Sequence, residues 1–219
     1  MMKQRKLLVQ RLGLVDYESA LRIQKETELA VKSGIQPDTL LLLEHPHTLT
    51  IGRRGDSSSI LLDHEQLRAR NVTLFETNRG GKVTYHGLGQ VVGYPIVNLS
   101  PDREDVHRYV RDLESVLIRT ASDYGIEAGR VAGLTGVWVG NEKLAAIGVR
   151  IARWITSHGF ALNVSSDLDY FKLIVPCGIA DRGVTSLSRL AGRPLTTAEV
   201  ATRTAEHFAN TFGFNNLHS

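Results

Sequence analysis

Residues 136–151 read GVWVGNEKLAAIGVRI, two apolar runs separated by the pair Gly140-Asn141. A glycine and an asparagine between two apolar runs are a signal for a two-residue turn that joins neighbouring strands. The segment therefore predicts a β-hairpin, with one strand over residues 136–139 and the second over residues 144–151.

Helices and further strands are predicted on both sides of the hairpin. The clearest helix covers residues 106–124, where apolar residues recur at every third or fourth position and Gly125 follows as a stop. Further helices are expected over 16–32, with Asp16 as the N-cap, over 167–173 and over 196–212, and further strands over 7–12, 39–43, 72–76, 90–99 and 158–164. Strands and helices do not alternate regularly. The pattern therefore favours an α/β fold of the α+β type, a mixed, largely antiparallel sheet flanked by helices, over a doubly wound parallel sheet.

Length and composition predict one globular unit. The chain has 219 residues, of which 42% are hydrophobic, enough for one sizeable core, so we expect a single domain over residues 1–219. No apolar run after the charged start Met1–Lys6 is long enough for a signal peptide or a membrane span, so we expect a cytoplasmic protein without a membrane partner. The formal charge of +3 is spread along the chain and only 6% of residues are aromatic, which argues against nucleic acid as a partner.

Residues 78–90, NRGGKVTYHGLGQ, are rich in glycine and carry an arginine, a tyrosine and a histidine. Glycines let a backbone approach a ligand closely. Neither phosphate-binding template fits, because Glu76 and Val83 break the Walker pattern and Val92 replaces the third glycine of the dinucleotide pattern. The segment is typical of a ligand wall that does not bind a nucleotide, or of a glycine-rich hairpin between strands.

Cys177 is the only cysteine of the chain, which excludes an intramolecular disulfide. A lone cysteine is more often a small buried apolar residue than a nucleophile. Pro176 and Gly178 predict a tight turn, however, in which the following backbone N–H groups can point at an oxyanion. A nucleophilic thiol needs a cation or a base nearby to become a thiolate. The candidates in this sequence are Lys143, His86, His158 and Arg182.

Lys143 lies between the hairpin turn and an apolar strand, so its aliphatic stem can follow the core while its ammonium group reaches a cleft. A solvated hairpin lysine is the alternative. Small residues on neighbouring predicted strands leave room for an apolar chain, and they are Ala145, Ala146, Gly148, Gly159 and Ala161. The pair of histidines in His45-Pro46-His47 is accompanied by no metal-binding pattern, so we predict no metal.

Four segments together resemble the lipoyl/octanoyl-[acyl-carrier-protein]:protein N-octanoyltransferase family of the biotin and lipoate protein ligase superfamily. The segments are Arg79-Gly80-Gly81 through Tyr85-His86-Gly87 with Gly89-Gln90, then Lys143 through Gly148, His158 through Asn163, and Pro176-Cys177-Gly178-Ile179. They occur in the family's order, and the similarity runs from about Leu12 to about Leu190. The resemblance implies the catalytic-domain fold of the biotin and lipoate ligases.

The resemblance also implies an acyltransferase that needs neither a cofactor nor ATP. Cys177, kept as a thiolate by Lys143, would attack the octanoyl thioester of acyl carrier protein, and the phosphopantetheine thiol of the carrier would leave. The acyl group would pass to a lysine of a lipoyl domain of a 2-oxoacid dehydrogenase or of the glycine-cleavage carrier protein. The implied acyl pocket consists of Arg79, Gly80, Gly81, Lys82, Val83, Thr84, Tyr85, His86, Ala146, Ile147, Gly148, His158, Gly159, Phe160 and Ala161.

Three other functions are weighed against this one. An ATP-dependent lipoate or biotin ligase on the same fold would not need Cys177. A cysteine hydrolase, with His86 or His158 as its base, would release free octanoate. A non-catalytic module that binds a carrier protein or nucleic acid would form no covalent acyl-enzyme. The spacing of the residues leaves open whether His86, His158 or Lys143 moves the proton.

Overall fold

The structure is a computed structural model that describes residues 5–175, 182–214 and 216–218. Its strands are β1 (Lys6–Leu14), β2 (Asp38–Glu44), β3 (Thr48–Ile51), β4 (Thr73–Glu76), β5 (Val83–His86), β6 (Gln90–Ile96), β7 (Gly129–Val131), β8 (Leu134–Val139), β9 (Glu142–Ala152), β10 (Ile155–Asn163), β11 (Gly183–Val184) and β12 (Asn216–His218). Its α-helices are α1 (Tyr17–Lys32), α2 (His64–Ala69), α3 (Val106–Ser122), α4 (Leu187–Ala191) and α5 (Thr197–Phe212), and its 3₁₀ turns are η1 (Ser57–Ser59) and η2 (Leu168–Leu173).

The described strands form two sheets. The large one has nine strands in the order β12-β1-β2-β6-β10-β9-β8-β7, with β11 beside β9. β1 pairs in parallel with β12 and β2, and β11 pairs in parallel with β9, whereas the remaining pairs from β2 to β7 are antiparallel. The small sheet has the order β4-β3-β5. The predicted mixed, largely antiparallel sheet flanked by helices is thus confirmed.

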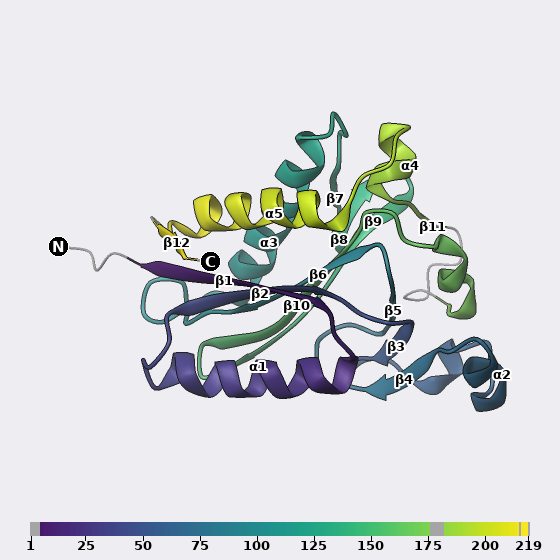
Figure 1. Cartoon of the computed structure of the whole chain (residues 1–219), viewed down its shortest axis with the longest axis horizontal. Coiled ribbons are helices and arrows are strands. Elements are labelled where there is room, and N and C mark those ends of the chain that lie inside the picture. Colours follow the sequence, from purple (N-terminus) through teal and green to yellow (C-terminus); the bar gives the residue numbers. More distant parts are fainter. Residues whose placement is uncertain (1–4, 176–181, 215, 219) are drawn as a thin grey trace.

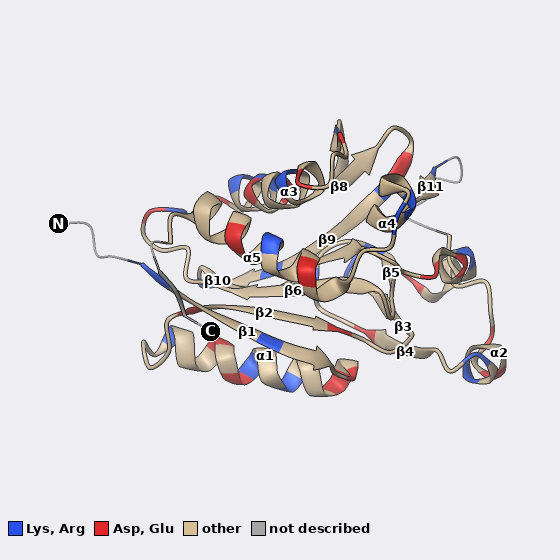
Figure 2. Ribbon diagram, turned by 45° about the horizontal axis from the view of Figure 1, so that its top comes forward, with Lys and Arg blue, Asp and Glu red and all other residues tan. Residues whose placement is uncertain are grey.

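Helices cover both faces of the large sheet (Figure 1). The core under α3 and α5 contains Leu113, Leu117 and Phe208, and a second core under α1 contains Ala20 and Val31. Every residue of β6 and of β10 is buried, because these central strands lie between the two helical layers. Figure 2 shows lysines, arginines and acids on helices, on loops and on strands such as β1 and β2, and none on β6 or β10.

Most predicted elements are found within one or two residues of their expected positions. Asp16 caps α1 by accepting a hydrogen bond from the backbone N–H of Ser19 at 2.8 Å, as the sequence predicts. The predicted hairpin is formed by β8 and β9, and Gly140 in its turn has a φ of 55°. The expected helix over 167–173 is the 3₁₀ turn η2. The sequence did not predict β3, β5 and α2, which are only four to six residues long.

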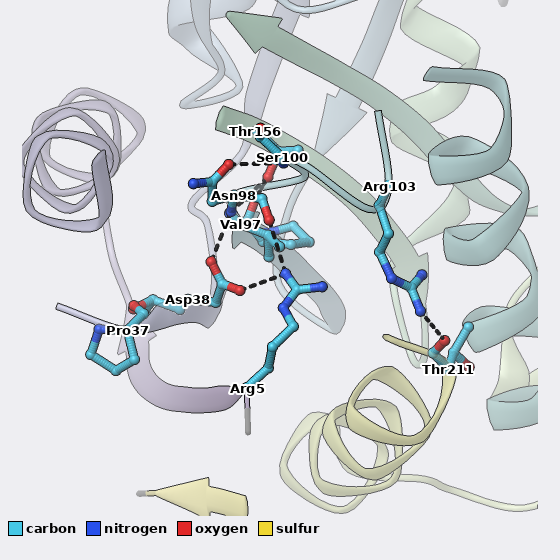
Figure 3. Close-up of polar contacts among 11 residues, drawn as sticks. Arg5, Pro37, Asp38, Val97, Asn98, Ser100, Arg103, Thr156 and Thr211 are labelled. Carbon is cyan, nitrogen blue, oxygen red and sulfur yellow. Dashed lines mark hydrogen bonds and ion pairs between the residues drawn. The ribbon is translucent and has the colours of Figure 1, made fainter. Parts of the chain in front are cut away.

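A cluster of polar contacts fastens β1 to β2 and to the chain after β6 (Figure 3). The Arg5 guanidinium donates to the Asp38 carboxylate at 2.7 Å and to the Asn98 carbonyl at 2.9 Å. The backbone N–H of Asn98 donates to the second oxygen of Asp38 at 2.8 Å. Burial raises the pKa of Asp38, and the hydrogen bonds from Asn98 and Arg5 oppose that rise. These contacts belong to the scaffold, because none of these three residues lines the cavity described below.

In the part of the chain that the structure describes, no helix combines the length and the apolar character that a membrane crossing requires. Within the same residues no group of three or more histidine, cysteine, aspartate or glutamate side chains could hold a metal ion. The expected single domain over residues 1–219 stays a prediction.

Candidate active site

A cavity of about 920 Å³ lies between β5 of the small sheet and the strands β6, β10 and β9 of the large one. Residues of α1, α3, β5, β6, the β7–β8 hairpin, β9, β10 and η2 all line it. All of the predicted pocket residues except Tyr85 are among its lining residues, and so is Lys143. Segments that are far apart in the sequence therefore meet around one space.

Tyr85 lies outside the cavity because side chains alternate along β5. Thr84 and His86 line the cavity, so the side chain between them points to the opposite face. There the Tyr85 ring is fully buried, and its hydroxyl is hydrogen-bonded to Nδ1 of His47 at 2.7 Å. Ala145 likewise belongs to the core under α3 and not to the cavity wall. From the sequence, both residues are expected beside the ligand. In the structure, the alternation of side chains along the strands places both on the other face.

Four small residues form one strip of the cavity wall. Gly148 pairs with Gly159 and Ala146 pairs with Ala161 across β9 and β10, and all four line the cavity. Gly148 also lets the loop of residues 79–81 approach, since a Cβ atom there would lie 2.7 Å from the carbonyl oxygen of Gly80. The backbone N–H of Gly80 donates to the carbonyl of Val149 at 2.9 Å. The strip offers an apolar surface with room for an unbranched chain.

Arg79 holds the loop over this strip. Its side chain is only 7% exposed, and its guanidinium donates to the carbonyl of Thr50 at 2.6 Å and to the hydroxyl of Thr50 at 2.8 and 3.2 Å. A further hydrogen bond of 2.9 Å reaches the carbonyl of Gly80. The buried guanidinium thus fixes the glycine-rich loop to β3, a role that only the tertiary contacts reveal.

Two buried histidines line the cavity together with Tyr17 and Tyr94. Burial and, to a lesser degree, the nearby Arg79 and Arg150 lower the pKa of His158 to about 4. Burial also lowers the pKa of His86 well below its usual range, helped by the neighbouring His45 and Arg79. Both imidazoles are therefore neutral at pH 7. They can exchange a proton or a hydrogen bond, but they supply no positive charge to hold a thiolate.

A chain of hydrogen bonds runs from the cavity wall to the backbone of Lys143. Nδ1 of His86 donates to Gln90, and the amide nitrogen of Gln90 donates to Asn163 at 2.9 Å. The amide nitrogen of Asn163 donates to the carbonyl of Thr185 at 3.0 Å, and the backbone N–H of Thr185 donates to the carbonyl of Lys143 at 3.0 Å. Gln90 and Asn163 are buried, so these bonds fix where β9 begins relative to the pocket.

Lys143 stands at the start of β9, where its ammonium nitrogen lies 4.7 Å from the centre of the Trp138 ring. The guanidinium carbon of Arg182 lies 5.2 Å from the centre of the same ring. The face of an indole attracts cations, so Trp138 gathers two positive charges beside the cavity. β11 pairs Val184 with Lys143, which connects the chain after residue 181 to this point.

Cys177 lies outside the described residues. Two described residues near the ends of this gap, Ile174 before it and Val184 after it, line the cavity that Lys143 also lines. Of the four candidate partners that the sequence offers for the thiol, His86 and His158 are neutral, whereas Lys143 and Arg182 are the two cations over Trp138.

Several site residues were not predicted from the sequence. Tyr17 and Tyr94 line the inner cavity, Trp138 positions the cations, and Val110 and Arg111 of α3 line the outer part. Asn163 is the last residue of a recognised segment, and that position could have identified it as a site residue. The others lie in ordinary helix and strand patterns, so no local signal separates them from core or surface residues.

The sequence and the fold are both similar to those of known proteins. Residues 16–209 match the family described as the lipoyl protein ligase A/B catalytic domain. The chain is 52% identical over 213 residues to the octanoyltransferase of Solibacter usitatus, covering 97% of this chain and 96% of that protein. It is 48% identical over 210 residues to the octanoyltransferase of Caldicellulosiruptor saccharolyticus, covering 95% and 89%.

A solved structure with a similar fold is a lipoate-protein ligase A bound with ATP. Its TM-score is 0.75 at 16% sequence identity, and the match covers 99% of this chain and 90% of that one. At this identity the likeness establishes the fold and does not bear on ATP use by this chain.

Proposed function

Because the chain belongs to the lipoyl protein ligase A/B catalytic-domain family, we propose that Cys177 carries the acyl group in the octanoyl transfer for which its relatives are named, with Lys143 as its catalytic partner. The enzyme is an acyltransferase of protein lipoylation, and its acceptors are lipoyl domains. The finer assignments are acyl carrier protein as the donor, and the lipoyl domains of 2-oxoacid dehydrogenases and the glycine-cleavage carrier protein as the acceptors.

One observation carries the assignment of the catalytic pair. Lys143 and the apolar strip of Ala146, Gly148, Gly159 and Ala161 line a single cavity, and so do Ile174 and Val184 on the two sides of the Cys177 segment. A thiol becomes a strong nucleophile when a cation stabilises its thiolate. Lys143 fits this role better than Arg182, because an ammonium group can also give up and recover a proton and a guanidinium cannot.

In the proposed reaction Lys143 gives up one proton in the first step and recovers one in the second. The Cys177 thiolate attacks the carbonyl carbon of the octanoyl thioester, the bond to the carrier's sulfur breaks, and that sulfur takes a proton from the Lys143 ammonium. An acceptor lysine amine then attacks the Cys177 thioester. Its proton passes to Lys143 as the amide forms and the Cys177 thiolate leaves. Thioester exchange is nearly isoenergetic and amide formation is downhill, so no ATP is consumed.

The apolar strip protects the intermediate. A thioester on Cys177 would be lost if water reached it, and an acyl chain lying against the four small residues would fill the space that water needs. The neutral state of His86 and His158 fits the same requirement, because an uncharged imidazole is easier to bury against hydrocarbon than a charged one.

Intact-protein mass spectrometry with octanoyl acyl carrier protein, and with no acceptor present, tests the proposal. The wild type should gain one octanoyl group that hydroxylamine removes, and Cys177→Ala should gain none. In Lys143→Met the rate of acylation should fall by about a hundredfold or more, because the thiol is then largely protonated at pH 7. An adduct on the Cys177→Ala protein would refute the assignment.

A parallel incubation with free octanoate and ATP separates transferase from ligase. A ligase would attach octanoate to a lipoyl domain in an ATP-dependent reaction that survives Cys177→Ala. We expect no such product. Release of free octanoate from the octanoyl carrier in the absence of acceptor, at the rate of acyl-enzyme formation, would instead indicate a hydrolase.

A further inference from the structure

The cavity extends beyond the acyl strip toward α3. Its outer wall is formed by Val106, Val110 and Arg111 of α3 and by Val131 and Leu134 of the β7–β8 hairpin. The whole cavity of about 920 Å³ is near the upper end for sites that enclose drug-sized ligands, and an eight-carbon chain is smaller than such a ligand. The acyl group therefore leaves the outer part available for another portion of a substrate.

The charged residues that line the cavity are almost all positive. Among the described residues its cations are Arg54, Arg79, Lys82, Arg111, Arg130 and Lys143, and its one acid is Glu114. Glu114 is buried and already accepts hydrogen bonds from Nε of Arg130 at 2.8 Å and from the backbone N–H of Gly136 at 3.1 Å. The positive charge that remains favours an anionic ligand.

Arg111 and Arg130 differ in their availability. Arg130 is held by Glu114 and by a hydrogen bond of 2.6 Å to the hydroxyl of Ser115. The side chain of Arg111 is exposed at the outer wall and makes no hydrogen bond or ion pair within the part of the chain that the structure describes. A guanidinium in this position is suited to a phosphate group, which it can contact with two parallel N–H donors.

Resting on the proposed function, we infer that the outer cavity holds the phosphopantetheine arm of the donor, with Arg111 contacting its phosphate. The thioester end of the arm lies beside Lys143, and the branched apolar part of the arm packs against Val110 and Leu134. The phosphate at the far end reaches the outer wall. Arg111 is then a specificity-determining residue that recognises the donor through its prosthetic group and not through the surface of the carrier protein.

Two small donors test this directly, namely octanoyl-pantetheine and octanoyl-4′-phosphopantetheine, which differ only in the phosphate. The measurement is kcat/KM for acyl-enzyme formation on Cys177, followed by intact-protein mass spectrometry. The wild type should prefer the phosphorylated donor by about tenfold, the effect of one exposed charge-assisted hydrogen bond. Arg111→Ala should bring the ratio of the two values close to one, and Arg111→Glu should bring it below one.

Arg119→Ala is the matched control. Arg119 is an exposed arginine of the same helix, it lies eight residues or about 12 Å further along, and it does not line the cavity. This variant should keep the wild-type ratio. Urea denaturation of all three variants checks that they fold as the wild type does.

Three outcomes overturn the inference. The wild type could show no preference for the phosphorylated donor, or Arg111→Ala could keep the preference. Calorimetric titration could also show that the wild type binds AMP and that Arg111→Ala does not, while Arg111→Ala still prefers the phosphorylated donor. That result would assign the outer cavity to a nucleotide phosphate. Failure of the proposed function looks different, because no donor would then acylate Cys177.

Discussion

Replacing Gly148 with alanine should push the loop of residues 79–81 away from β9. A Cβ atom at this position would lie 2.7 Å from the carbonyl oxygen of Gly80 and 3.1 Å from Cδ of Arg79. The nearer atom belongs to the backbone, and Arg79 ties the same loop to Thr50 through its buried guanidinium. The added methyl group can therefore be accommodated only if the loop moves and the bond from Gly80 to Val149 lengthens or breaks.

The size of the effect follows from these contacts. Overpacking a well-packed site costs about 1–3 kcal/mol, and loss of one backbone hydrogen bond costs about 0.5–1.5 kcal/mol. We expect the free energy of unfolding to fall by about 2–4 kcal/mol. The rate of acyl-enzyme formation should fall as well, by about tenfold or more, because the displaced loop no longer closes the acyl strip.

Urea denaturation and single-turnover acylation are the assays. The midpoint should shift to lower urea at an unchanged m-value, since the folded state stays compact. Gly129→Ala is the matched control, because a Cβ atom at Gly129 would meet nothing within 4 Å. If Gly148→Ala denatured and acylated like Gly129→Ala, the close approach of the loop to β9 would play no part in stability or in catalysis.

Three further predictions concern the buried polar groups. Burial lowers the pKa of both His45 and His158 to about 4, below the unfolded value near 6.5, so the unfolded chain binds more protons at acidic pH. The stability that each neutral histidine contributes is complete above about pH 6.5 and should decrease by up to about 3 kcal/mol as the pH falls toward 4. Urea denaturation at a series of pH values measures this decrease, which should be smaller in His158→Asn. Asn163→Leu should lower the free energy of unfolding by about 1–3 kcal/mol and slow acylation, since it removes the hydrogen bond to the carbonyl of Thr185 and leaves the amide of Gln90 with only its longer bond to the carbonyl of Tyr85. Wild-type acylation in this variant would contradict the positioning role. Arg5→Ala should cost about 1–3 kcal/mol in urea denaturation, because it removes the ion partner of Asp38, and should leave acylation unchanged.

The elements that the sequence predicted best are those with local signals. Asp16 caps α1 and Thr196 caps α5, so that both helices begin within one residue of their predicted starts. The Gly140-Asn141 turn gave the β8–β9 hairpin. β5 was missed because its four residues lie inside a glycine-rich segment, where pairing with β3 and not propensity makes the strand.

In the candidate site too, some residues could be identified from local sequence and others only from the fold. Most of the described residues of the recognised segments line the cavity, and each segment is short enough to be identified from the sequence alone. Tyr17, Tyr94 and Arg111 join them only through the packing of α1, β6 and α3 around the same space. Tyr85 shows the opposite case, since the pleat of β5 turns it away from its neighbours.

The sequence by itself determined the local conformations, the family resemblance and the candidate nucleophile, because turns, caps and apolar periodicity act over a few neighbouring residues. Only the tertiary structure decided that His86 and His158 are neutral while Lys143 lies beside Trp138, and that the cavity is lined mainly by cations. The reason is physical. Desolvation and charge–charge interactions depend on which distant segments surround a group, and a linear pattern does not contain that information.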